Sequence, residues 1–315
     1  MKRGPGSAYL ALVVLALIWG FSWIAMKVAT RDATPLALAI GRSAVGAVAL
    51  LALLPATGRA LRPPPFVPTL ILGLLQTTLY TVVASVAIML GSAGNTSVLV
   101  YTMPFWLALL AWPVLRERIG GARWLALFLA AVGLAFILGP LRGGTTVSRL
   151  LAVLCGLVWA VSAIWAILLQ RSGRYELLSM TAWQMVWGTL AMLPLVLVLP
   201  CEARWTGSFT LAILYLGVAA SAAGWLLWLF ILSRLPPSAA GVASMGTPMV
   251  GVISASLLLH EIPTRGELTG IACILTALLV NARAAAPPPV PARPGTVSAP
   301  HTFATEPRDD RAGSR

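Results

Sequence analysis

The sequence predicts an all-α integral membrane protein of about ten transmembrane helices, built as two inverted five-helix repeats. Three observations support this fold class. The 315 residues are 59% hydrophobic and 10% charged, with a mean hydropathy of +0.89, whereas soluble domains are about 25% charged. Long apolar runs alternate with short segments rich in proline, glycine and arginine. The pattern of the first half also returns in the second half.

Ten apolar segments follow one another along the chain. They cover residues 9–29, 35–54, 67–90, 96–115, 124–139, 150–170, 178–199, 209–232, 239–259 and 268–280. Each crosses, or nearly crosses, about 30 Å of hydrocarbon at about 1.5 Å per residue. Their unbroken apolar runs indicate helices, because the strands of a membrane barrel alternate in polarity over about ten residues.

The two halves share side chains at a nearly constant spacing. The offset is 140 residues in the first segment, 142 in the second and 144 from the third onward. Matched pairs are Trp19/Trp159, Gly46/Gly188, Gly73/Gly217, Pro104/Pro248 and Glu117/Glu261, among others. Because the offset changes only between apolar runs, where insertions are tolerated, we interpret residues 9–139 and 150–283 as tandem repeats.

The odd number of segments in each repeat has a structural consequence. Five spans make the second repeat enter the membrane from the side opposite to the first, which gives an inverted repeat. Two such halves can expose one central site alternately to each side of the membrane. A duplication kept for stability alone is the alternative interpretation.

The distribution of positive charge predicts the orientation. The net charge of +13 arises from basic residues that stand singly between apolar runs. They form no patch interleaved with aromatic residues, so no nucleic-acid partner is expected. With a cytoplasmic N-terminus, fifteen lysines and arginines lie in inside segments and six in outside segments, which fits the positive-inside rule. Residues 1–8 and the proline-rich tail 284–315 are therefore predicted to be cytoplasmic, and the tail to be disordered.

Residues suited to catalysis or metal binding are sparse. The three cysteines and two histidines lack metal-ligand spacing, and no HExxH motif or nucleophile–base pair occurs. All nine acidic residues lie at segment ends, in loops or in the tail. We expect no enzyme activity, no metal and no cofactor. We also expect no cation exporter driven by a carboxylate in mid-membrane.

Short motifs carry a family resemblance. They are ALIWGFS at 16–22, Arg42, YTMPF at 101–105, LRER at 115–118, MGTPM at 245–249 and LHEIP at 259–263. Taken in order over residues 8–283, these motifs resemble an EamA-type member of the drug/metabolite transporter superfamily. The resemblance implies ten helices with both termini cytoplasmic in a bacterial inner membrane, and a central cavity lined by spans 1–4 and 6–9. It also implies export of amino acids or related small metabolites.

Two other classes of function stay open beside that expectation. A multidrug or toxic-compound exporter would use the same fold, whereas a receptor or membrane scaffold would transport nothing. A receptor or scaffold does not explain the inverted repeat. The expected partners are therefore a small-molecule substrate and the lipid bilayer.

Arg42 is the leading candidate for a substrate-binding residue. It lies about 10 Å deep at helical rise, where a guanidinium costs roughly 2.5–3.5 kcal/mol unless it finds a partner or water. In one interpretation it attracts a substrate carboxylate or phosphate. In the other it bonds to backbone carbonyls or snorkels outward and fixes the spans together. Its repeat equivalent, Gln184, is polar but neutral.

The remaining cavity candidates are polar or aromatic. Gln76 and Tyr80 stand four residues apart on one helical face, and Tyr101 lies one turn before a proline. Tryptophans near mid-span form either a pocket wall or packing. The predicted cavity residues are Trp19, Arg42, Gln76, Tyr80, Tyr101, Trp159, Gln184 and Trp228.

Two matched pairs suggest mechanical roles. Pro104 and Pro248 lie inside the fourth and ninth segments, where proline kinks a helix, and they act either as hinges for alternating access or as fixed bends. Glu117 and Glu261 end the same segments just before the next helix. The N-terminal dipole of that helix favours an anion, so both are predicted helix caps, with a role in coupling as the alternative.

The fifth and tenth segments carry few polar side chains, unlike the third. They are therefore predicted to lie at the periphery. Small residues at Ala126, Ala130 and Gly133 allow close helix approach there. Spans 5 and 10 face either lipid alone or a partner subunit in a homodimer.

Overall fold

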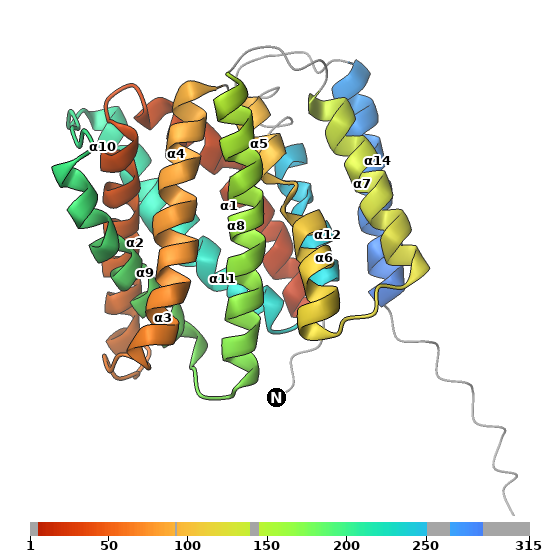
Figure 1. The fold of residues 1–315 in the computed structure, drawn as a ribbon, viewed down its shortest axis with the longest axis horizontal. Helices are drawn as coiled ribbons and strands as arrows, with labels where there is room; N and C mark the ends of the chain where they lie inside the picture. The colour runs from red at the N-terminus through yellow and green to blue at the C-terminus, as the bar shows by residue number, and fades with distance from the viewer. Residues whose placement is uncertain (1–5, 92, 139–144, 251–264, 286–315) are drawn as a thin grey trace, which may run out of the picture. The chain divides into compact units, whose positions relative to one another are not determined.

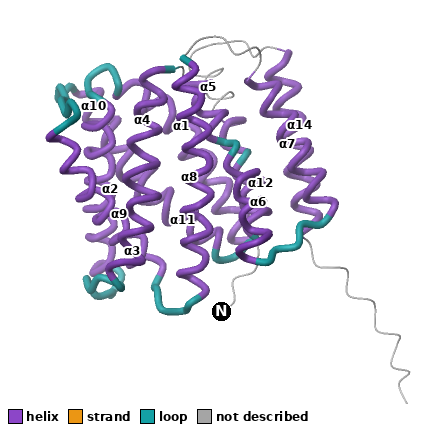
Figure 2. Tube along the Cα trace, in the orientation of Figure 1, coloured by secondary structure: helices purple, strands orange, loops and turns teal. Residues whose placement is uncertain are grey.

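The apolar runs form helices where the sequence predicts them (Figure 1). The computed structural model of the chain describes residues 6–91, 93–138, 145–250 and 265–285. Within these ranges, strand pairing is limited to one antiparallel bridge between Ala33 and Ala203 (Figure 2). The N-terminal residues 1–5, Glu261 and the tail 286–315 lie outside them.

Seven helices of the described ranges are long enough and apolar enough to cross a membrane. They cover Ser7–Ala29, Pro35–Ala56, Phe66–Leu90, Val98–Leu115, Thr146–Arg171, Leu177–Leu197 and Gly207–Leu232. Shorter apolar helices cover Gly121–Ile137 and Leu268–Asn281. The chain is therefore a multi-pass, all-α membrane protein.

Eight helical elements are described in the first half of the chain. They are α1 (Gly6–Ala29), α2 (Pro35–Ala56), α3 (Phe66–Gly73), the π-helical η1 (Leu74–Leu79), α4 (Tyr80–Leu90), α5 (Ala93–Val100), α6 (Met103–Leu115) and α7 (Gly121–Leu138). Elements α3, η1 and α4 follow without a break and form one long helix.

The second half repeats this arrangement as far as it is described. Its elements are α8 (Thr146–Arg171), α9 (Leu177–Met192), the 3₁₀-helical η2 (Leu193–Leu197), α10 (Gly207–Leu214), the π-helical η3 (Tyr215–Ala223), α11 (Gly224–Leu232), α12 (Pro237–Ser244) and α14 (Arg265–Ala285). Elements α10, η3 and α11 again form one long helix.

Local sequence sets several helix starts. Thr145 and Thr206 accept hydrogen bonds from backbone N–H groups in the first turns of α8 and α10, and Glu176 does the same for α9. Pro35 opens α2 directly after Thr34. A proline suits that position because its missing N–H would have no partner inside the helix.

The two halves interleave within the unit that ends at Ala285. Helix α2 of the first half packs against α9 and η3 of the second, and α9 packs against α3 and η1. Helices α4 and α6 pack against α8, and α1 packs against α11. Each half therefore completes the packing of the other.

Matched glycines bring these helices together at two crossings. A Cβ on Gly46 of α2 would lie 2.9 Å from the carbonyl oxygen of Gly217 in η3. A Cβ on Gly188 of α9 would lie 2.5 Å from the carbonyl oxygen of Gly73 in α3. Gly46 matches Gly188 in the sequence repeat, and Gly73 matches Gly217. The same close approach, which only a residue without a side chain permits, is thus made twice.

Helices α7 and α14 pack along each other (Figure 1). A Cβ on Gly133 of α7 would lie 2.9 Å from the carbonyl oxygen of Gly270 in α14, and Ala126 and Ala130 are fully buried within the same chain. The small residues that suggested a homodimer contact in span 5 are therefore covered by the chain itself. This intramolecular partner was not predicted from the sequence.

Candidate functional site

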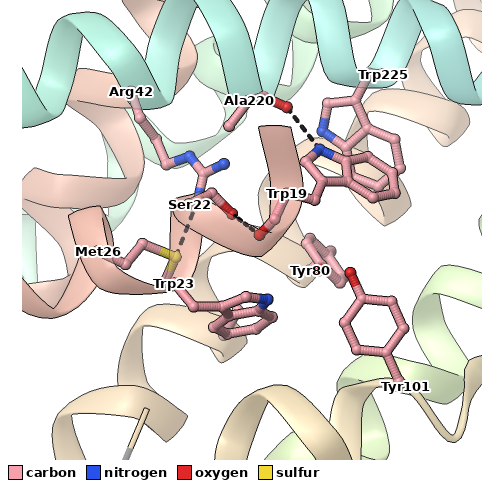
Figure 3. A pocket seen from close by; sticks show the side chains of 10 residues that line it. Trp19, Ser22, Trp23, Met26, Arg42, Tyr80, Tyr101, Ala220 and Trp225 are labelled. Carbon is pink, nitrogen blue, oxygen red and sulfur yellow. Dashed lines mark hydrogen bonds between the residues drawn. The ribbon is translucent and has the colours of Figure 1, made fainter. Parts of the chain in front are cut away.

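A cavity lies between helices of both halves. It is lined by Trp19, Ser22, Trp23, Met26, Arg42, Tyr80, Ala84, Tyr101, Ala220 and Trp225 (Figure 3). Four of the predicted cavity residues, Trp19, Arg42, Tyr80 and Tyr101, are in this lining. Helices α1, α2 and α4 and Tyr101, in the turn between α5 and α6, supply most of the wall, and η3 and α11 of the second half supply the rest.

Arg42 is buried, with 8% of its surface exposed. Its Nε donates a hydrogen bond to Ser221 Oγ at 3.1 Å, and a terminal nitrogen lies 3.1 Å from Met26 Sδ. Figure 3 shows the guanidinium directed toward Ser22 and Met26, away from the helix that carries it. Both of these partners are neutral, and a thioether is a weak acceptor. The side chain therefore points inward and does not snorkel to the membrane surface.

The other walls are aromatic. Trp19 lies edge to face with Trp159 and Trp225, with ring centroids 5.2 and 5.4 Å apart. Tyr80 packs edge to face against Trp225 at 5.5 Å, and Tyr101 packs against Trp159 at 5.7 Å. Such pairs gain about 0.5–1.5 kcal/mol beyond their burial. The cluster thus fixes the orientation of the rings around the cavity.

Trp159 and Trp228 belong to the same aromatic cluster but lie farther from the cavity. Their rings lie 5.4 Å apart and both are fully buried. Neither is among the residues that line the cavity. Each has an indole N–H without a hydrogen-bond partner among the described residues. These two predicted cavity residues therefore support the lining in the present conformation.

Gln76 and Gln184 are buried but lie outside the cavity lining. The Thr77 hydroxyl donates to Gln184 Oε1 at 2.9 Å. Neither polar atom of the Gln76 side chain has a partner within the described part of the chain. The structure therefore separates these two predicted residues from the four that line the cavity.

Some lining residues were not singled out from the sequence. Ser22, Trp23 and Met26 follow Trp19 at helical spacing and lie on the same face of α1. That shared face could have identified them as lining residues. Trp225 corresponds to Thr81 in the first half, so comparison of the two repeats did not indicate an aromatic residue at this position.

The π-helical segments η1 and η3 hold the polar contacts of this region. In η3, the Ala220 carbonyl accepts the Trp19 indole N–H at 2.9 Å, and the adjacent Ser221 bonds Arg42. In η1, Thr78 donates to the Gly188 carbonyl at 2.7 Å. A π-helix widens the turn and changes which groups face a neighbouring helix, and such segments occur frequently at functional sites. No feature of the sequence predicted them.

Tyr101 lies in a break between α5 and α6. The turn at Tyr101 and Thr102 separates the two helices, with Thr102 N–H bonded to the Leu99 carbonyl at 3.1 Å. Pro104 is therefore in the first turn of α6 and not inside a kinked helix. In the second half, α12 ends at Ser244 and Pro248 follows a turn at Met245. Both predicted hinge prolines thus follow a helix break.

Glu117 caps a different helix from the one predicted. Its carboxylate accepts hydrogen bonds from the backbone N–H and the hydroxyl of Ser238, in the first turn of α12. It also forms an ion pair with Arg123 at 3.2 Å. The capped N-terminus is that of α12 in the second half, not that of the following helix α7. Glu117 therefore joins the two halves.

Ion pairs join the two halves of the chain at both ends of α2. Beside the start of α2, Asp32 pairs with Arg204, in the segment before α10, at 3.1 Å and accepts a hydrogen bond from Thr206, the N-cap residue of α10, at 2.9 Å. Beyond the opposite end of α2, Arg59 pairs with Glu176, the N-cap residue of α9, at 3.0 Å. We call the first contact the Asp32 clasp and the second the Arg59 clasp.

Comparison with known proteins gives the family. The model of the EamA-like transporter family matches the chain twice, at residues 6–139 and 147–283. The uncharacterized transporter YoaV of Bacillus subtilis is 27% identical over 280 residues, covering 86% of this chain and 95% of the relative. A probable amino-acid metabolite efflux pump of Escherichia coli is 27% identical over 296 residues, covering 89% and 95%.

A solved crystal structure is similar in fold. It matches with a TM-score of 0.75 at 20% sequence identity, and the match covers 89% of this chain and 98% of that one. At this identity the likeness concerns the fold alone. The two family matches together cover nearly all of the chain before the tail, so this protein belongs to the EamA-like transporter family.

Proposed function

We propose that this protein is a secondary transporter that exports amino acids or related small metabolites across a bacterial inner membrane by alternating access. The observation that carries the proposal is Arg42, a buried cation on the wall of an aromatic cavity to which both halves contribute. A guanidinium forms two parallel hydrogen bonds with a carboxylate. Arg42 therefore binds the acidic group of the substrate, while Trp19 and Tyr80 contact its apolar part.

The proposal includes ten spans in two inverted halves, with both termini in the cytoplasm. Support comes from seven long and two shorter apolar helices in the described residues, and from the double match of the family model. Further support comes from contacts that recur at the repeat spacing, such as the two glycine crossings. Equivalent contacts in the two halves are expected where a pseudo-two-fold axis in the membrane plane relates one half to the other.

The moving parts in this proposal are the helix breaks and the π-helical segments. The turns before Pro104 and Pro248 already interrupt the regular helical hydrogen bonds, so each helix can change direction there. The wider turns of η1 and η3 lie next to the Arg42 and Gln184 contacts. A change in either segment would therefore move cavity residues directly.

The substrate class is supported by relatives as well as by the cavity. Two relatives, in Salmonella typhimurium and Escherichia coli, are named probable amino-acid metabolite efflux pumps. They are 28% and 27% identical to this chain.

Counterflow in proteoliposomes tests the proposal. Vesicles loaded with an unlabelled amino acid or a related carboxylate are diluted into the radiolabelled compound, and exchange is followed over time. We expect saturable exchange that the Arg42→Gln variant loses at equal protein content. The matched control is Arg171→Gln, which removes an exposed guanidinium at the end of α8. Absence of exchange for every compound in the wild-type protein would contradict transport and favour a scaffold.

A further inference from the structure

The formal charges around the cavity are unbalanced. Arg42 is the one charged side chain among the ten lining residues, and the lining contains no carboxylate. Asp32, Glu117 and Glu176 each pair with an arginine at helix ends. Within the described residues, the positive charge of Arg42 is thus not compensated by a nearby anion.

The hydrogen bonds show the same imbalance. Ala220 O is already used by the Trp19 indole, and the Ser22 hydroxyl donates to Trp19 O at 2.8 Å. Arg42 has five N–H donors, of which one points to a hydroxyl and another to the Met26 thioether. The site therefore offers donors to a ligand and little that would accept an ammonium group.

An amino group on the ligand would lie close to the same guanidinium. In an α-amino acid the ammonium is two bonds from the carboxylate carbon, so it would sit beside Arg42 when the carboxylate is bound. Like charges repel strongly at that distance in a medium of low dielectric constant. An ammonium can be stabilised over an aromatic face, but the edge-to-face pairs of Trp19 and Trp225 already cover ring faces of the cluster.

We infer that the cavity selects aromatic monocarboxylates without an amino group over zwitterionic amino acids and over amines. This inference rests on the proposed function and narrows its substrate class to organic anions. The carboxylate pairs with Arg42, whose charge it neutralises. The cavity has a volume of about 30 Å³, room for one water, so the aromatic ring of the ligand enters when the bundle opens. It then packs against the edges of the Trp225 indole and the Tyr80 ring.

Three compounds that share a phenyl group and differ in charged groups test the selectivity. They are 3-phenylpropionate, phenylalanine and 2-phenylethylamine, which present the same phenyl group with a carboxylate, with both charges, and with an ammonium only. Binding to the full-length protein in lipid nanodiscs is measured by titration calorimetry, and empty nanodiscs correct for partition into lipid. We expect 3-phenylpropionate to bind about tenfold or more tightly than phenylalanine, and 2-phenylethylamine to bind least.

Variants assign the selectivity to Arg42. Arg42→Gln should remove the preference for the carboxylate, Arg42→Lys should keep part of it, and Arg171→Gln should leave it unchanged. Equal or tighter binding of phenylalanine or of the amine by the wild-type protein overturns the inference, as does binding of none of the three. If phenylalanine binds as tightly as 3-phenylpropionate and exchanges in proteoliposomes in an Arg42-dependent manner, the proposed function stands while the inference fails.

Discussion

Arg42 and Gln184 make matching contacts in the two halves of the chain. Arg42 Nε lies 3.1 Å from the hydroxyl of Ser221, and Gln184 Oε1 lies 2.9 Å from the hydroxyl of Thr77. Ser221 and Thr77 belong to the π-helical segments η3 and η1. All four positions correspond at the repeat spacing, so both halves make the contact, and only the contact of Arg42 involves a charged side chain.

The Thr77–Gln184 contact should act structurally. Both side chains are buried, and a neutral buried hydrogen bond contributes about 0.5–1.5 kcal/mol. We expect Thr77→Val and Gln184→Leu each to lower the free energy of unfolding, and the double variant to lose less than the sum of the two. Reversible unfolding in mild detergent, arranged as a double-mutant cycle, measures the coupling. Strictly additive losses would show that the contact is unimportant.

The matched glycine crossings should each be intolerant of a methyl group. Because a Cβ on Gly188 would overlap the Gly73 backbone, we expect Gly188→Ala to cost about 1–3 kcal/mol, as overpacking does. Gly46→Ala should behave in the same way at the other crossing. Thermal unfolding of the purified variants checks this.

Gly207→Ala is the matched control for the crossings. Gly207 opens helix α10, and a Cβ there would meet no atom within 4 Å among the described neighbours. This variant should unfold at the wild-type temperature. A Gly188→Ala protein as stable as Gly207→Ala would mean that the helices separate at no cost.

Much of the fold follows from the sequence because hydrophobic length is a strong signal. The first eight predicted apolar segments coincide with described helices to within a few residues, since a membrane span needs about 20 apolar residues and little else. Four of the eight predicted cavity residues line the cavity. Arg42 was recognisable because a charged side chain deep in an apolar run is energetically costly, and such residues usually have a partner or a function.

The remaining features depend on contacts between segments far apart in the chain. The partner of Glu117 lies 121 residues away, and hydropathy does not say which helix end a carboxylate meets. The intramolecular packing of α7 on α14 was missed for the same reason. The π-helical segments need one extra residue per turn, which the composition of a uniformly apolar helix does not reveal.

Glu117 should matter more for stability than an exposed ion pair. The side chains of Glu117 and Arg123 are 11% and 16% exposed, whereas those of Arg59 and Glu176 are 44% and 46% exposed. Because Glu117 also accepts the first-turn bonds of α12, we expect Glu117→Gln to cost about 1–3 kcal/mol. Arg59→Gln should cost about 0–1 kcal/mol. Equal losses on unfolding would contradict a capping role for Glu117.

The Asp32 clasp should hold the cavity closed on the outer side. In the proposed orientation it lies outside and the Arg59 clasp inside. The outer clasp combines an ion pair and a hydrogen bond from Thr206 with the bridge between Ala33 and Ala203. Among the described residues, the inner clasp consists of a single ion pair, between Arg59 and Glu176. Removing about 1 kcal/mol from the outer clasp would raise the outward-open population about fivefold.

Cysteine labelling measures that shift. A cysteine replaces Ser22 in the cavity, in a chain whose Cys155, Cys201 and Cys273 are changed to alanine, and intact cells are treated with a membrane-impermeant maleimide. We expect Asp32→Ala to accelerate labelling several-fold, because it opens the path from outside. Arg59→Gln should leave the rate unchanged or reduce it, since weakening the inner clasp favours the inward-facing state. If both variants accelerate labelling equally, the clasps loosen the bundle without setting its direction, and the assignment of the Asp32 clasp to outer closure is wrong.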